Sequence, residues 1–214
     1  MTTTLLIVAA ALAVGDWAAV HLRLFRVEYL LKPATLAVLV AAAVTADLGD
    51  PKPWVVAALV FGLLGDVGLM LSRDGRTDPP FIAGLAAFLV GHLCYLVAFV
   101  RAGLHGLESL AGLLIVGGVA GLALPAVLRG ARRSAGREFS YVVAGYSAVL
   151  AAMAVLAVGT SIVATALGGV LFLTSDTLIA RDRFVARVRH GPLLVIVTYH
   201  LAQFLILIGL IESF

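Results

Sequence analysis

The chain has 214 residues, of which 62% are hydrophobic and 13% charged, and its mean hydropathy is +1.11. Soluble domains contain about 45–50% apolar residues, so this composition excludes a soluble globular protein and predicts an integral membrane protein. The formal charge of +3 does not indicate nucleic-acid binding, because the basic residues lie in short segments between apolar runs.

Eight apolar runs are long enough to cross a membrane as helices, since about 20 residues span roughly 30 Å of hydrocarbon. They are Thr4 to Val20, Val27 to Ala46, Trp54 to Leu71, Phe81 to Val100, Leu107 to Leu128, Phe139 to Val158, Ser161 to Ala180 and Pro192 to Ile211. The breaks between them are short and rich in Gly, Pro or charge, so none separates soluble domains. We therefore predict an all-α, polytopic membrane protein with a single eight-helix transmembrane domain over residues 1–214.

The basic residues predict the orientation of these spans. Loops after the odd-numbered spans contain 13 of the 15 Lys and Arg residues, and only Lys52 and Arg101 fall on the other side. By the positive-inside rule, the odd-numbered loops, including the one with Arg73 and Arg76, face the cytoplasm and both termini lie outside. The Arg-rich, Lys-poor and Ala-rich composition is typical of a bacterium of high genomic GC content, so we expect the bacterial inner membrane.

Three pairs of residues recur at intervals of 110 to 112 positions. They are Asp66 with Asp176, Pro80 with Pro192, and His92 with Gln203. These offsets are compatible with two parallel four-helix repeats, residues 1–106 and 107–214. Helices of similar length also produce such offsets by chance, so both interpretations stay open.

Two acids lie at one depth inside predicted spans, Asp66 in the third and Asp176 in the seventh. A charge within the hydrocarbon costs about 2.5–3.5 kcal/mol on insertion scales, so such a residue indicates a functional site. At 1.5 Å per residue, Asp66, Asp176, Tyr146 and Tyr199 all lie roughly 8–11 Å inside the cytoplasmic ends of their spans, and Asp16 is near the inner end of the first. We therefore predict a pocket that opens toward the cytoplasmic leaflet. The alternative is a purely structural, hydrogen-bonded pair of acids.

Other polar residues extend this predicted pocket. His92 and Tyr95 share one face of the fourth span, and Gln203 shares a face of the eighth span with Tyr199. Lys32 must lie within a helix, because a span that began after Pro33 would be only about 21 Å long, too short to cross. A cation at this interface suits a lipid phosphate, although a lysine that snorkels to the boundary explains it equally well.

With these residues assembled, the sequence resembles the YhhN family of membrane lysoplasmalogenases. The resemblance rests on KP at Lys32 and Pro33, GD at Gly65 and Asp66, FIAGLAAFLVGHLCY with His92 and Tyr95, TSD ending at Asp176, and YHLAQ with Tyr199 and Gln203. It implies an enzyme that hydrolyses the vinyl-ether bond of lysoplasmalogens to a fatty aldehyde and a glycerophospho-alcohol, without a recognised metal cofactor. The implied partners are a lysophospholipid substrate and the bilayer, whereas no nucleic acid is implied and no oligomeric state is defined. Another lysolipid or ether lipid is an alternative substrate.

Vinyl-ether hydrolysis needs an acid that protonates the alkenyl carbon and an anion that steadies the resulting cation, much as glycosidases pair two carboxyl groups. We hypothesise that Asp66 and Asp176 form this catalytic acid/base pair, without assigning the two parts. Lys32 would hold the phosphate. The other substrate-binding residues would be His92, Tyr95, Tyr146, Tyr199 and Gln203.

Two other functions stay open. Buried acids also form proton relays, so the chain is alternatively a small-molecule or proton-coupled transporter. A metal-dependent lipid hydrolase would place zinc among His92, His200, Asp66 and Asp176, but the sequence contains no H-E-x-x-H motif. The prediction is therefore a hydrolase with no metal and no cofactor.

Overall fold

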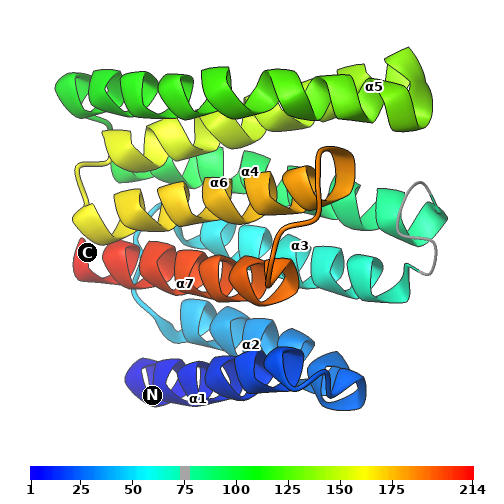
Figure 1. The fold of residues 1–214 in the computed structure, drawn as a ribbon. Helices are drawn as coiled ribbons and strands as arrows, with labels where there is room; N and C mark the ends of the chain where they lie inside the picture. Colours follow the sequence, from blue (N-terminus) through cyan, green and yellow to red (C-terminus); the bar gives the residue numbers. More distant parts are fainter. Residues whose placement is uncertain (73–77) are drawn as a thin grey trace. The chain divides into compact units, whose positions relative to one another are not determined.

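The computed structural model describes residues 1–72 and 78–214 of the chain. Within these residues it contains seven α-helices and no strand. They are α1 (Thr2–His21), α2 (Phe25–Thr45), α3 (Lys52–Leu71), α4 (Pro79–Ala102), α5 (Gly106–Gly159), α6 (Val163–Phe184) and α7 (Gly191–Glu212) (Figure 1). Each is long and apolar enough to cross a membrane, which confirms the prediction of an all-helical integral membrane protein.

The fifth and sixth predicted spans both lie in α5, which contains 54 residues and consists of two helices that meet at a kink at Gly136. The loop that we predicted between them, RGARRSAGRE, is wrong, because its backbone is helical except at Gly136. Arg, Ala and Glu dominate that segment and are good helix formers. Their charge marks the end of an apolar run, but it does not end the helix.

At Gly136 the backbone of α5 leaves the helical conformation, with φ of 89° and ψ of 176°, values that glycine adopts without a steric penalty. Helix α5 then turns back on itself. A Cβ atom on Gly112 would lie 2.9 Å from the carbonyl oxygen of Val155, and the His105 N–H donates a hydrogen bond to the carbonyl oxygen of Gly159 at 2.8 Å. Residues 106–135 and 137–159 are therefore two arms that lie side by side (Figure 1).

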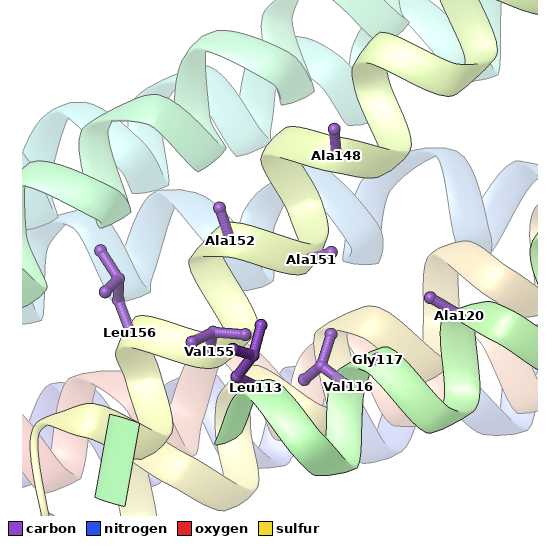
Figure 2. A pocket seen from close by; sticks show the side chains of 9 residues that line it. All are labelled: Leu113, Val116, Gly117, Ala120, Ala148, Ala151, Ala152, Val155 and Leu156. Carbon is purple, nitrogen blue, oxygen red and sulfur yellow. The ribbon is translucent and has the colours of Figure 1, made fainter. Parts of the chain in front are cut away.

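Between the two arms of α5 lies an apolar groove of about 410 Å³. Figure 2 shows the side chains that line it, which are those of Leu113, Val116, Gly117, Ala120, Ala148, Ala151, Ala152, Val155 and Leu156. Most of them are small, so the arms leave space between them.

The chain divides into two compact units, and residues 1–101 with 210–214 form the first. In this unit α1 packs on α2, and α2 packs on α3. Helices α3 and α4 meet backbone to backbone: a Cβ atom on Gly68 would lie 2.6 Å from the Cα of Gly84, and one on Gly84 would lie 3.0 Å from the carbonyl oxygen of Gly65. We call these three residues the glycine seam. It fixes α4 against the helix that carries Asp66.

Residues 102–209 form the second unit. Here α5 packs on α6, with the Phe139 and Phe184 rings edge to face at 5.9 Å. Helix α6 also packs on α7, because the Ser175 hydroxyl donates to the carbonyl oxygen of Val195 at 3.1 Å. Helix α6, which carries Asp176, therefore contacts both of its neighbours in the chain.

The glycine seam generates a stability prediction. Gly68→Ala should lower the thermal unfolding midpoint in detergent, since the new methyl group collides with backbone that cannot rotate away; overpacking of this kind typically costs about 1–3 kcal/mol. Gly118→Ala is the matched control, because nothing lies within 4 Å of its added Cβ. The control should unfold at or above the wild-type temperature, as alanine favours helix. Equal midpoints for both variants would contradict the seam.

Candidate functional site

An ion pair joins two membrane-length helices of the first unit. The Lys32 ammonium of α2 lies 3.0 Å from Oδ1 of Asp66 on α3. The Asp66 side chain is 1% exposed and the Lys32 side chain 15%. Each charge therefore compensates the other in a place where an isolated charge would be costly.

The position of Lys32 follows from the start of α2. The helix begins at Phe25 and continues through Pro33, so Lys32 lies inside it, as the sequence predicts. The Thr35 hydroxyl donates to the carbonyl oxygen of Leu31 at 2.8 Å, close to the point where the proline lacks an N–H. The pairing with Asp66 differs from our expectation, in which Lys32 binds a lipid phosphate.

Asp16 of α1 is a further acid in this unit, and it lies outside the set of predicted site residues. It is fully buried, and neither carboxylate oxygen has a hydrogen-bond partner among the residues that the structure describes. It lies within electrostatic reach of Lys32, Glu28 and Asp66. The signal that could have found it is the same one that found Asp66, an acid in an apolar span.

Helix α4 contributes the predicted residues His92 and Tyr95, both only 1% exposed. The Tyr95 ring stacks on that of Phe99 at 5.7 Å. One turn before His92, the Phe88 ring occupies the space beside Gly65, where an added Cβ would lie 2.6 Å from it. The residue before Asp66 therefore has room only for a hydrogen atom, and the helix with His92 and Tyr95 packs directly there.

In the second unit the structure brings together two residues that the sequence placed at one depth. The Tyr146 hydroxyl on the second arm of α5 donates a hydrogen bond of 2.6 Å to Oδ2 of Asp176 on α6. The two side chains therefore meet, a pairing that the common depth alone does not predict. This length is within the normal range for a hydrogen bond between two oxygen atoms, so Tyr146 orients the Asp176 carboxyl group.

Helix α7 adds buried polar side chains to the same unit. Tyr199 is 4% exposed, and its ring lies edge to face on Phe172 of α6 at 5.4 Å. It also lies within electrostatic reach of Tyr146. Gln203 and His200 are fully buried, and the His200 ring is 5.7 Å from that of Tyr199. Tyr146, Asp176 and Tyr199 therefore form the polar cluster of this unit.

The groove between the arms of α5 is not part of this cluster. At 100° per residue, Ala148 and Val155 lie about 180–200° around the helix from Tyr146. The groove in Figure 2 is lined by apolar residues, and neither Tyr146 nor Asp176 is among them. It offers space but no reacting group.

No set of three His, Cys, Asp or Glu side chains within the described ranges is arranged to hold a metal ion. The chemistry that these residues do offer is that of carboxyl groups. Asp66 has a cationic partner and Asp176 a phenolic one. A carboxylate in such a place stabilises a positive charge that develops on a bound ligand, and a carboxylic acid in such a place delivers a proton.

Two curated proteins are similar in sequence to this chain. Lysoplasmalogenase TMEM86A of Bos taurus is 33% identical over 171 residues, which cover 74% of this chain and 65% of that protein. The protein of the same name from Homo sapiens is 30% identical over 171 residues, with the same shares of each chain. The chain thus spans about 65% of the length of these curated relatives. No solved structure is significantly similar to it.

The profile of the YhhN family matches residues 27–210. The matched stretch contains Lys32 and Asp66 as well as Tyr146 and Asp176, so both polar pairs described above fall within it. Since the match extends over most of the chain, this membrane protein belongs to the YhhN family.

Proposed function

We propose that this protein is a membrane hydrolase that cleaves the vinyl-ether bond of lysoplasmalogen-type lysolipids and releases a fatty aldehyde and a glycerophospho-alcohol. Two relatives at 30–33% identity are named lysoplasmalogenases. The observation that carries the proposal is the ion pair between Lys32 and Asp66, because it keeps a carboxylate ready inside the membrane-spanning part of the family match. Hydrolysis is favoured over transport by the names of these relatives, and no metal cluster in the described part of the chain favours a metal-dependent hydrolase.

The proposed reaction begins with proton transfer to the alkenyl carbon that is not bonded to oxygen. The C=C π bond supplies the electron pair, and an oxocarbenium-like cation forms. Water then adds to the carbon bonded to oxygen and loses a proton, and the hemiacetal collapses to aldehyde and alcohol. The overall change consumes one water molecule and leaves the protonation of the enzyme unchanged.

The two carboxyl groups take different parts in this scheme. Asp66, paired with the Lys32 ammonium at 3.0 Å, is the anion that steadies the oxocarbenium ion. In a two-carboxyl scheme Asp176 is then the proton donor, held in orientation by the Tyr146 hydroxyl. A difference in surroundings between two acids is the usual basis of such a division.

The remaining site residues bind the lysolipid and the water. Lys32, the partly exposed member of its ion pair, reaches the phosphate. The residues that orient water and the ether oxygen are His92, Tyr95, Tyr146, Tyr199 and Gln203. The substrate is a lysophospholipid that enters from the bilayer, and the proposed site opens toward the cytoplasmic leaflet of a bacterial inner membrane.

We also propose that the chain crosses the membrane eight times, with both termini outside. The support is that α5, with 54 residues, would extend for roughly 80 Å if straight, far more than the hydrocarbon thickness. Each of its arms then makes one crossing. Arg129, Arg132, Arg133 and Arg137 are exposed near the turn, where the positive-inside rule expects them; Arg73 and Arg76 lie outside the described residues. We further propose that the chain is one membrane domain built from two four-helix repeats, residues 1–106 and 107–214. The division of the chain into two units after residue 101 supports the boundary between these repeats.

The reaction class is tested by incubating purified protein with a lysoplasmalogen and with its saturated ether analogue. We expect the fatty aldehyde and the glycerophospho-alcohol from the first lipid only, because a saturated ether has no π bond to protonate. Mass spectrometry of the products measures both. Equal cleavage of the two lipids, or cleavage of neither, would end the proposal.

The two carboxyl groups are tested by Asp66→Asn and Asp176→Asn, which keep the side-chain shape. Each should lower kcat by about 10²–10⁴-fold, the usual contribution of acid–base groups. Asp50→Asn, which changes an exposed acid, should retain wild-type activity. Binding of the saturated ether analogue to each variant reports whether it is folded. Full turnover by either carboxyl variant would refute its role.

The topology is tested with single cysteines in a Cys94→Ala background, which lacks the chain's single cysteine. Cysteines at Thr3 and Ser213 should both react with a membrane-impermeant maleimide added to intact bacterial cells. A cysteine at Ser134 should react only after the cells are opened. If α5 crossed only once, the two termini would lie on opposite sides, and only one of them would be labelled from outside.

A further inference from the structure

Around Lys32, the first unit contains more buried acid than this one ammonium group can pair at one time. Lys32 contacts Asp66 at 3.0 Å, while Asp16 is fully buried with both carboxylate oxygens lacking a hydrogen-bond partner within the described chain. An unsatisfied carboxyl group in such a place is costly, whereas an apolar residue would cost nothing there. A hydrogen-bond donor or cation that reaches Asp16 in another conformation would remove this cost.

We propose that Asp16 is a positioning residue that acts on Asp66 through Lys32. Its carboxylate on α1 is a second buried ion-pair partner for the lysine ammonium. The inference rests on the proposed function, in which Asp66 is the anion that meets the oxocarbenium ion. It concerns a residue outside the stretch that the family profile matches, which begins at residue 27. Membership of the family therefore assigns no role to Asp16.

Helix packing places Asp16 near Lys32. Helices α1 and α2 pack together, and a Cβ atom on Gly15 would lie 3.1 Å from Cδ1 of Leu31. These two residues directly precede Asp16 and Lys32. Asp16 and Lys32 are also within range of electrostatic interaction with each other. The absence of a side chain on Gly15 keeps the two helices close at this level.

The lysine side chain suits an exchange between two carboxylates. Its ammonium is a point charge on a flexible four-carbon stem, so it can leave one acid and reach another without the backbone moving. An arginine would instead hold a carboxylate through two parallel hydrogen bonds. Lys32 is also 15% exposed, in contrast to the 1% of Asp66, so it is the less confined member of the pair.

The exchange changes what the substrate meets. While Lys32 lies on Asp66, its positive charge cancels much of the attraction between that carboxylate and a developing cation. When the ammonium moves to Asp16, Asp66 presents its full negative charge to the oxocarbenium ion, and Asp16 gains the donor that it lacks. No proton is gained or lost in this step, because the ammonium and both carboxylates keep their charges.

Steady-state kinetics of the full-length protein test the role in the reaction. Asp16→Asn should lower kcat about tenfold or more with KM unchanged, because Lys32 then stays on Asp66 and Asp16 does not touch the substrate. Asp16→Glu should restore most of kcat. Lys32→Arg should also lower kcat, since the guanidinium grips Asp66 and resists exchange. Glu28→Gln is the matched control: Glu28 is half-buried one turn from Lys32, and kcat should stay within about twofold because solvent screens its charge.

A thermal-stability cycle tests the contact between Asp16 and Lys32 without any turnover. Lys32→Met leaves both acids uncompensated and should lower the unfolding midpoint. Asp16→Asn should raise the midpoint more in the Lys32→Met background than in the wild-type background, since the acid is without a cation only in the former. Glu28→Gln should show a smaller difference between the two backgrounds.

The two experiments separate the inference from the proposed function. Wild-type protein that cleaves no lysoplasmalogen overturns the function, while the stability cycle still tests the shared lysine. Equal shifts in the two backgrounds overturn the sharing. A wild-type kcat in Asp16→Asn overturns the positioning role, even if the cycle shows coupling.

Discussion

The ion pair between Lys32 and Asp66 is the constraint on which the first unit depends. Two charged side chains can persist among membrane-spanning helices only when they compensate each other, so α2 and α3 must keep these residues at the same depth and facing one another. This requirement explains why α2 continues through Pro33 despite the lost backbone hydrogen bond. The glycine seam holds α4 against the same segment of α3.

The second unit holds its acid by a different physical means. Asp176 accepts a hydrogen bond from the phenol of Tyr146, and a hydrogen bond from a neutral group stabilises a carboxylate less than an adjacent cation does. One acid is thus fixed by charge and the other by orientation. The proposed reaction needs one anion and one proton donor. The proposed mechanism therefore gives these two roles to the two acids, one role to each.

Apolar runs in the sequence predict the helices well, because hydropathy over about 20 residues reflects the thickness of the bilayer. The α5 error has a physical cause: charge and glycine mark the limits of the hydrocarbon, but Arg, Ala and Glu keep the backbone helical up to Gly136. Depth along each helix places Tyr146 and Asp176 in one layer, and the structure joins them by a hydrogen bond. It does not predict the pairing of Lys32 with Asp66 or the proximity of Asp16, because depth says nothing about the rotation of each helix about its axis.

The glycine seam divides the first unit mechanically. Helices α3 and α4 touch through backbone atoms at Gly68 and Gly84, so neither can slide or roll on the other without a collision, and together they behave as a rigid plate. In the proposed reaction, a movement within the first unit that admits a lipid chain to Asp66 would therefore have to come from α1 and α2, which carry Asp16 and Lys32, while α3 and α4 stay fixed on each other.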